Sequence, residues 1–371
     1  MPLEALRGIA ALVVVAWHFT MSFFPGEIDA ANCTLCVSPL FAFFHGTAAV
    51  GVFFALSGYV LTRRYFETGE KRILVIGALK RWFRLFLPVF LSVMMSWILF
   101  HFHLYRYEEA AKISHSGWLI SFGFAMRPPF DPTFWTALRE GFTEAFFHDN
   151  NALNPILWTI HLELIGSFIV FAFAALISHL RAHPWLAAII TVIVMIPIHY
   201  VDPAMAPFVP GCLLAFYSPR HKSVSLPEAI LLILFGMAFI GYRQAVGFYF
   251  MFDFQGPIAG DTVIDYTSAI GAILIMIALI GCAPLRKALS GRVAQIVGRL
   301  SFPIYLVHMI LICSLGSAVF AAVYKEGNYN QAALTTLAAL LPAILIFAWI
   351  FMVIDVKWIA FVNGKFRKVK I

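Results

Sequence analysis

The fold is decided by LRGIAALVVVAWHF, the stretch from Leu6 to Phe19, which is almost entirely apolar. It holds two exceptions, a cation at Arg7 and an imidazole at His18, and membrane helices normally exclude both residue types. The apolar run is close to the length that crosses a bilayer. We interpret it as a retained first transmembrane helix rather than a cleaved signal peptide, because many further apolar segments follow it.

The composition extends this interpretation to the whole chain. Of the 371 residues, 61% are hydrophobic and 12% are charged, which is about half the charged fraction of a soluble protein. The mean hydropathy is +0.87. We therefore predict an all-α integral membrane protein that forms a single domain over residues 1–371, with no appended soluble domain. The net charge of +7 does not gather in a soluble segment, so we expect no nucleic-acid partner.

About ten segments are apolar enough to cross a bilayer as helices of roughly 20 residues. The sixth is interrupted by Pro207 and Pro210, so it is expected to be kinked or partly re-entrant. The predicted segments are 5–25, 42–64, 85–104, 155–178, 185–200, 204–218, 227–243, 266–283, 299–323 and 332–355.

The distribution of basic residues predicts the orientation of these helices. With the amino terminus in the cytoplasm, 20 of the 26 lysines and arginines fall on the cytoplasmic side. This bias predicts that both termini are cytoplasmic, and we expect the plasma membrane as the location. The basic tail after Asp355 is expected at the inner membrane surface. On the outer side, residues 105–154 are expected to contain an amphipathic helix, and residues 244–265 carry an aromatic stretch.

Two polar residues are predicted to lie near the middle of the membrane. At about 1.5 Å per residue, His18 lies roughly 16 Å deeper than Arg7. Glu163, in LWTIHLEL, reaches a similar depth when counted from the outer end of its segment. An uncompensated carboxylate there costs about 3 kcal/mol, so we predict that Glu163 pairs with His18. A histidine oriented by a carboxylate is an arrangement suited to a general base.

A cluster of arginines is predicted at the cytoplasmic ends of the first and third helices. Arg81 and Arg84 are three residues apart in KRWFRLFLP and share a helix face, and Arg7 lies on the same side of the membrane. Planar guanidinium groups suit phosphate binding. We hypothesise that a phosphate-bearing donor binds there and extends toward His18; the alternative is that these cations only set the topology.

Four further residues are candidates of a weaker kind. Ser57 lies beside Gly58 in a segment whose small residues favour close helix packing, and His308 lies in SFPIYLVH. Each of these two side chains either lines the path of the substrates or only contributes to helix packing. Cys33 and Cys36 are placed in an outer loop, where the pair is a candidate disulfide. Zinc would need more ligands than this loop offers, so we predict no metal site.

Taken in order, these motifs resemble the membrane-bound acyltransferase-3 family of O-acyltransferases. Arg7 and His18, separated by ten residues, resemble its first-helix hallmark. GVFFALSGYVL, KRWFRLFLP, LWTIHLEL and SFPIYLVH resemble its later motifs, although Lys80 stands where an arginine is common. The resemblance covers nearly the whole chain.

The resemblance implies an activity and a role for each candidate residue. The expected reaction moves an acyl group, most often acetyl, from cytoplasmic acyl-CoA to a hydroxyl of a carbohydrate or other envelope molecule. Acyl-CoA is then a co-substrate, and no tightly bound cofactor is expected. His18 is expected to act as general base or to carry the acyl group transiently. Glu163 would orient it, and the donor's phosphates would bind Arg7, Arg81 and Arg84, with Ser57 and His308 lining the path.

Two rival functions remain open at this point. A proton-coupled secondary transporter would use Glu163 and His18 as a relay. A flippase-like carrier would move an acylated product instead.

Overall fold

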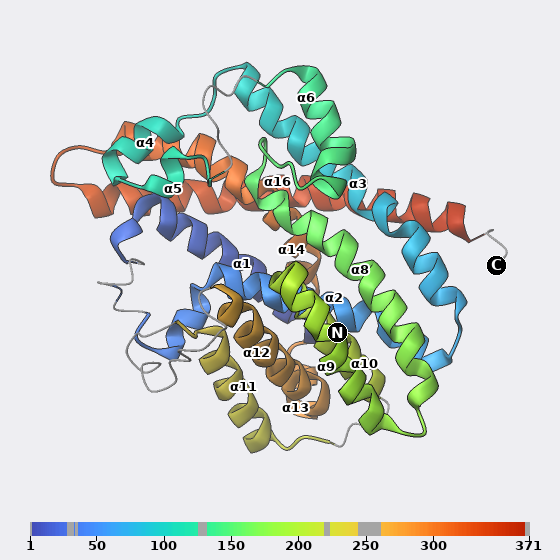
Figure 1. The fold of residues 1–371 in the computed structure, drawn as a ribbon. Coiled ribbons are helices and arrows are strands. Elements are labelled where there is room, and N and C mark those ends of the chain that lie inside the picture. The colour runs from blue at the N-terminus through green and yellow to red at the C-terminus, as the bar shows by residue number, and fades with distance from the viewer. Residues whose placement is uncertain are drawn as a thin grey trace.

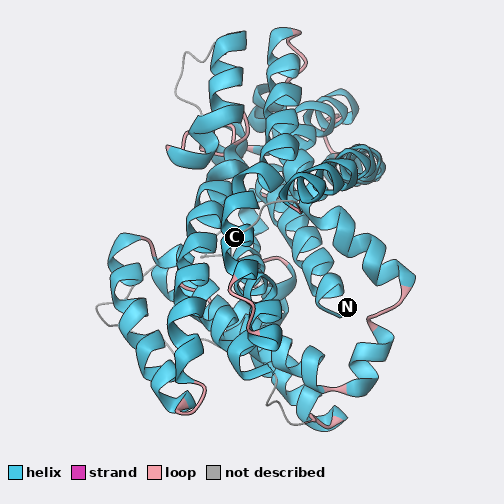
Figure 2. Cartoon of the chain, turned by 90° about the vertical axis from the view of Figure 1, so that its right-hand side faces the viewer, coloured by secondary structure: helices cyan, strands magenta, loops and turns pink. Residues whose placement is uncertain are grey.

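The computed structural model describes residues 2–27, 33, 36–124, 132–218, 223–243 and 261–367. Every regular element in these residues is a helix, and no strand occurs among them (Figure 2). Eight of the described helical segments are long and apolar enough to cross a membrane, so the protein is an all-α, multi-pass integral membrane protein. They are Pro2–Phe23, Gly46–Thr68, Arg72–His101, Pro155–Leu180, Pro184–Val201, Thr262–Gly281, Arg292–Val323 and Tyr329–Phe366.

Each of the ten predicted segments overlaps one of these helices or one of two shorter apolar ones, Pro203–Tyr217 and Leu226–Ile240. The shorter pair contains the proline-interrupted sixth segment. In the labels of Figure 1 the main helices are α1 (Pro2–Phe23), α2 (Gly46–Thr68), α3 (Arg72–His101), α8 (Trp158–Ile177), α9 (Pro184–Val201), α10 (Phe208–Tyr217), α11 (Leu226–Ile240), α12 (Asp261–Gly281), α14 (Arg292–Leu311), α15 (Ser317–Val323) and α16 (Tyr329–Phe366).

Two predicted boundaries were wrong by more than ten residues. Helix α3 begins at Arg72, well before the predicted start at residue 85. Helix α16 continues to Phe366, so most of the predicted surface tail belongs to it. The reason is mutual packing: Trp358 Nε1 donates to the Phe83 carbonyl at 2.6 Å, and Lys80 Nζ donates to Asn363 Oδ1 at 3.1 Å. Each helix therefore supports the polar extension of the other.

The helices define two ends of the bundle. At one end, which we call the basic end, α3 begins beside the end of α16, and Arg72 Nη2 lies 3.4 Å from the Arg367 carbonyl. This end lies to the lower right in Figure 1, near the label of the carboxyl terminus. At the opposite end, the Tyr329 hydroxyl donates to the Phe23 carbonyl. Helix α1 runs from the basic end to the opposite end.

Small residues let the central helices touch. A Cβ atom at Gly58 of α2 would clash with the Phe208 carbonyl oxygen, and one at Gly211 of α10 would clash with the Ala55 carbonyl oxygen. Neither contact can be relieved by a side-chain movement, because the obstacle is backbone. The predicted packing role of the small residues near Ser57 therefore holds for Gly58.

The connection between α3 and α8 folds back onto the bundle. Helices α4 (Tyr107–Ser114) and α5 (Gly117–Ile120) are followed by α6 (Phe134–Arg139), and helical structure continues to Phe147. The expected helix is thus present, but it is not simply amphipathic, because Glu140 is buried and both its oxygens accept from Leu153 N. Burial raises the pKa of Glu140 to about 8. The aromatic stretch at 244–260 lies outside the described residues.

Candidate active site

Two histidines from opposite ends of the sequence form a hydrogen-bonded pair. His18 of α1 and His308 of α14 approach with Nδ1 and Nε2 2.8 Å apart, and their ring planes are nearly parallel, at 12°. His308 Nδ1 lies 2.6 Å from the Tyr305 carbonyl oxygen. A carbonyl only accepts, so Nδ1 of His308 carries a proton and its Nε2, in the neutral ring, accepts from His18 Nδ1–H. Nε2 of His18 is therefore the unprotonated nitrogen, the form that a general base requires.

The surroundings fix the orientation of the His18 ring. Trp118 of α5 stacks on it, with ring centroids 5.0 Å apart and planes at 10°. Helix α5 is tied to α1 by Ser116, whose hydroxyl donates to the Met21 carbonyl at 2.6 Å. His308 is completely buried, whereas His18 is partly exposed. The pair thus combines a buried, orienting ring with a partly exposed one.

The predicted contact between Glu163 and His18 was wrong. Glu163 Oε1 instead pairs with the Arg81 guanidinium and accepts from the Ser57 hydroxyl at 2.6 Å. The cause is the early start of α3. Arg81 lies nine residues after the first residue of the helix, Arg72, which is roughly 14 Å along its axis. Arg81 therefore reaches the depth of Glu163 and provides the partner that the carboxylate needs. Arg81 Nε also donates to Ser167 at 2.6 Å.

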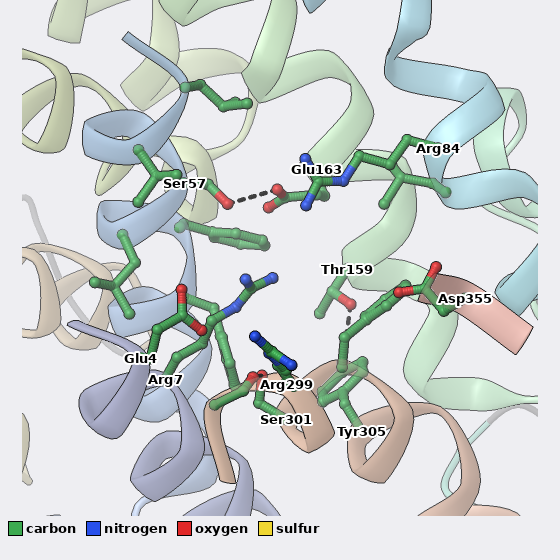
Figure 3. Close-up of a pocket in the computed structure, with 18 of the residues that line it drawn as sticks. Glu4, Arg7, Ser57, Arg84, Thr159, Glu163, Arg299, Ser301, Tyr305 and Asp355 are labelled. Atoms are coloured by element: carbon green, nitrogen blue, oxygen red, sulfur yellow. Dashed lines mark hydrogen bonds between the residues drawn. The ribbon is translucent and has the colours of Figure 1, made fainter. Parts of the chain in front are cut away.

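A cavity of about 330 Å³ opens beside this ion pair (Figure 3). Arg7 and Arg299 reach into it from α1 and α14, and Ser57 and Glu163 lie across from them. Within the described part of the chain, Arg7, Arg84 and Arg299 make no hydrogen bond or ion pair through their guanidinium groups, unlike Arg81. Three cations are thus available to a ligand in one cavity.

Arg299 and Asp355 are site residues that the sequence analysis did not select. Arg299 begins the predicted segment 299–323, which also carries His308, and a cation at the inner end of a helix with a candidate histidine was the signal that could have found it. Asp355 of α16 also lines the cavity, and its buried Oδ1 has no hydrogen-bond partner among the described residues. The cavity therefore also offers an acceptor for a ligand's N–H or O–H group.

The cavity ends one helical turn from the histidine pair. Tyr305 lines it, and the Tyr305 ring centroid is 5.7 Å from that of His308. The Tyr305 hydroxyl donates to the Ile156 carbonyl at 2.8 Å and lies 2.9 Å from Thr159 Oγ1. Tyr305 thus connects the cationic cavity with the histidine pair: its side chain lines the cavity, and its carbonyl fixes the His308 tautomer.

A second cavity, of about 530 Å³, lies between α2, α3 and α16 at the basic end. We call it the basic groove. It shares Arg81 and Arg84 with the first cavity, so the two are neighbours. Its further cations are Arg64, Arg72, Lys80 and Arg367.

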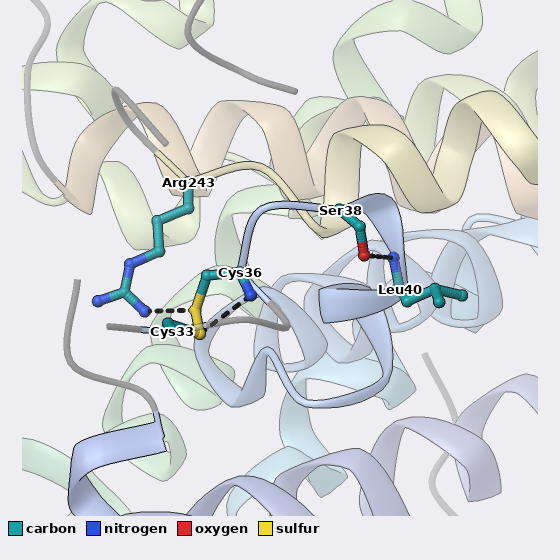
Figure 4. The surroundings of a disulfide bond; sticks show 5 residues. All are labelled: Cys33, Cys36, Ser38, Leu40 and Arg243. Atoms are coloured by element: carbon teal, nitrogen blue, oxygen red, sulfur yellow. Dashed lines mark hydrogen bonds between the residues drawn. A yellow bond between two sulfur atoms is a disulfide. The ribbon is translucent and has the colours of Figure 1, made fainter. Parts of the chain in front are cut away.

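The predicted site residues thus fall into two groups. The structure gathers five of them around the first cavity: Arg7, Ser57, Arg81, Arg84 and Glu163. His18 and His308 form the separate pair beyond Tyr305. Cys33 and Cys36 lie elsewhere, near the opposite end of the bundle, and are bonded to each other (Figure 4).

The Cys33–Cys36 disulfide is expected in the purified protein. Arg243 Nη1 lies 3.0 Å from Cys36 Sγ, and both cysteines are buried. Mass spectrometry after alkylation under denaturing, non-reducing conditions should find this pair unmodified. Cys212, Cys282 and Cys313 are unpaired in the structure and should be alkylated in the same sample. Alkylation of all five cysteines would contradict the disulfide.

Comparisons with known proteins assign the chain to a family. Residues 3–353 match the acyltransferase-domain family Acyl_transf_3, so the chain belongs to this family of acyltransferases. It is 23% identical over 375 residues to the O-acetyltransferase PaAT-1 of Phomopsis amygdali, covering 85% of this chain and 73% of the relative. No solved structure matches the chain.

Proposed function

We propose that the protein transfers an acyl group, most simply acetyl, from acyl-CoA to a hydroxyl group. The observation that carries this proposal is the cationic cavity with three unpaired arginines that ends one turn of α14 from a histidine pair of fixed tautomer. The family supports acyl transfer, and the O-acetyltransferase relative supports oxygen as the acceptor atom. The basic end is then the cytoplasmic face, in agreement with the positive-inside bias.

The donor would bind with its charged groups at the basic end. Arg7, Arg84 and Arg299 supply planar donors for the phosphates of CoA. Arg81, which we expected among them, is occupied by Glu163 and instead shapes the wall of the cavity. The acyl end of the donor would then extend along the cavity toward Tyr305 and the histidines.

His18 would perform the proton transfer. Its Nε2 takes the proton of the acceptor hydroxyl as that oxygen attacks the thioester carbonyl. The C–O bond forms, the C–S bond breaks, and the proton passes from His18 to the departing sulfur of CoA. His308 Nε2, which accepts from His18 Nδ1–H, stabilises the positive charge that develops on the His18 ring. The same tautomer also permits a transient acyl group on His18 Nε2.

The acceptor molecule and the cellular location are proposed from what membership of the family implies. We propose a carbohydrate or another envelope molecule as the acceptor, and the plasma membrane as the location. A transporter with a Glu163–His18 proton relay is disfavoured, because each of these residues has a different partner in the structure. Release of the CoA thiol from acetyl-CoA by the purified protein separates the two functions, since a transporter leaves the thioester intact.

Loss of one cavity arginine is expected to weaken CoA binding. Arg7→Ala, Arg84→Ala and Arg299→Ala should each raise the Kd for CoA about tenfold, or about 1.4 kcal/mol, with a further rise at higher ionic strength. Isothermal titration in detergent measures this. Arg63→Ala is the matched control, because Arg63 lies at the same end but pairs with Glu67. Unchanged affinity in all three cavity variants would contradict the donor assignment.

A further inference from the structure

The basic groove carries cations that the proposed transfer reaction does not use. Arg64 and Lys80 take part in none of the ion pairs found among the described residues, and the hydrogen bond of Lys80 is to a neutral acceptor, Asn363 Oδ1. Lys80 lines the groove together with Arg64 and Arg84, so three like charges share one cavity. Glu70 is the one acidic side chain among the described residues that line the groove, so the lining stays cationic, and a bound anion would reduce the repulsion between these like charges.

The groove and the first cavity are arranged as two adjoining anion sites. Arg84 lines both, and Lys80 lies four residues before it on α3, a rise of about 6 Å. A ligand that fills both sites must therefore carry two phosphate groups separated by roughly this distance or more. The rest of the ligand must be narrow and uncharged, so that it can continue along the first cavity.

We infer that the basic groove binds the 3′-phosphate of the nucleotide in CoA, while the first cavity takes the pyrophosphate and the pantetheine arm. This inference rests on the proposed function and specifies its donor. The groove then selects a free nucleotide thioester over a thioester carried on phosphopantetheine alone, because the latter lacks the second phosphate. Lys80, which lines the groove four residues before the shared Arg84, is the residue that binds this phosphate.

Binding of CoA and of dephospho-CoA, which lacks the 3′-phosphate, tests the inference. The wild-type protein in detergent should bind CoA at least about tenfold more tightly, equivalent to about 1.4 kcal/mol. Lys80→Met should remove this preference and leave the dephospho-CoA affinity within about twofold. Arg299→Ala should weaken both ligands and keep their ratio. Lys71→Met is the matched control, because Lys71 lies at the same end of α3 but outside both cavities, and it should change neither affinity.

Two outcomes would contradict the inference, and a third would contradict the proposed function. If Lys80→Met and Arg64→Ala, both monodisperse in detergent, weaken CoA and dephospho-CoA equally, the groove acts only through its general charge, and the inference fails while the proposed function stands. If phosphatidic acid in the micelles removes the preference for CoA in the wild type, the groove is a lipid headgroup site, and the inference also fails. If the wild type binds neither nucleotide, the donor in the proposed function is wrong.

Discussion

Replacing His18 by alanine is expected to lower the rate of acyl transfer by 10² to 10⁴-fold, the range that general-base catalysis commonly contributes. The reason is that Nε2 of His18 is the unprotonated nitrogen of the pair. Affinity for CoA should stay unchanged, because none of the cavity arginines contacts His18. Initial rates of thiol release, measured with CoA titrations on the same preparation, test both parts. An active His18→Ala protein would remove this histidine from the chemistry.

His308 is expected to act through His18 as a positioning residue. His308→Ala should cost about 10²-fold in rate, and the double variant with His18→Ala should be no slower than His18→Ala alone, because the two rings act as a unit. His308→Gln should restore part of the rate, since the glutamine amide oxygen is able to accept from His18 Nδ1–H. Losses that multiply in the double variant would show two independent roles.

The second large effect is expected on stability, at the ion pair of Glu163 and Arg81. The two side chains are 15% and 7% exposed, so removing one partner leaves the other charge buried. Such a loss typically costs about 3–5 kcal/mol. Glu163→Ala and Arg81→Ala should therefore each lower the apparent Tm in detergent strongly. The double variant Glu163→Leu with Arg81→Met should lose less than either single variant, because no unpaired charge remains.

The surface pair of Arg106 and Glu109 provides the control for this experiment. Its side chains are 53% and 56% exposed, and such pairs contribute at most about 1 kcal/mol, so Arg106→Ala should leave the apparent Tm nearly unchanged. A Glu163→Gln protein as stable as the wild type but slower by 10²-fold would contradict the account, since it would place Glu163 in the chemistry rather than in the fold.

The sequence predicted the membrane helices well, because hydropathy depends on local composition. It predicted the third helix less well: KRWFRLFLP is basic at its start and was interpreted as a helix end, whereas packing against α16 extends the helix back to Arg72. Because the helix begins earlier than predicted, Arg81 lies at the depth of Glu163. The partner assigned to Glu163 was wrong for this reason, although its need for a partner was predicted correctly.

The contact between the two histidines could not be predicted from one sequence. His18 and His308 are 290 residues apart, and hydropathy gives the depth of a residue but not its position around the bundle. Both residues were selected as candidates, but depth alone favoured Glu163 as the partner of His18. The disulfide between Cys33 and Cys36 was easier to predict, because its two residues are close in the chain and the predicted topology places them on the oxidising side.

The central claim, O-acyl transfer that depends on His18, is tested most directly by isotope labelling. Membranes that contain the wild-type protein or His18→Ala at equal abundance would be supplied with acetyl-CoA deuterated in its acetyl group, and the products analysed by mass spectrometry before and after mild alkali. The account predicts an alkali-labile deuterated acetyl ester that forms in wild-type membranes and is at least 10²-fold reduced with His18→Ala. Equal labelling in both membranes, or label found only in alkali-stable amides, would contradict it.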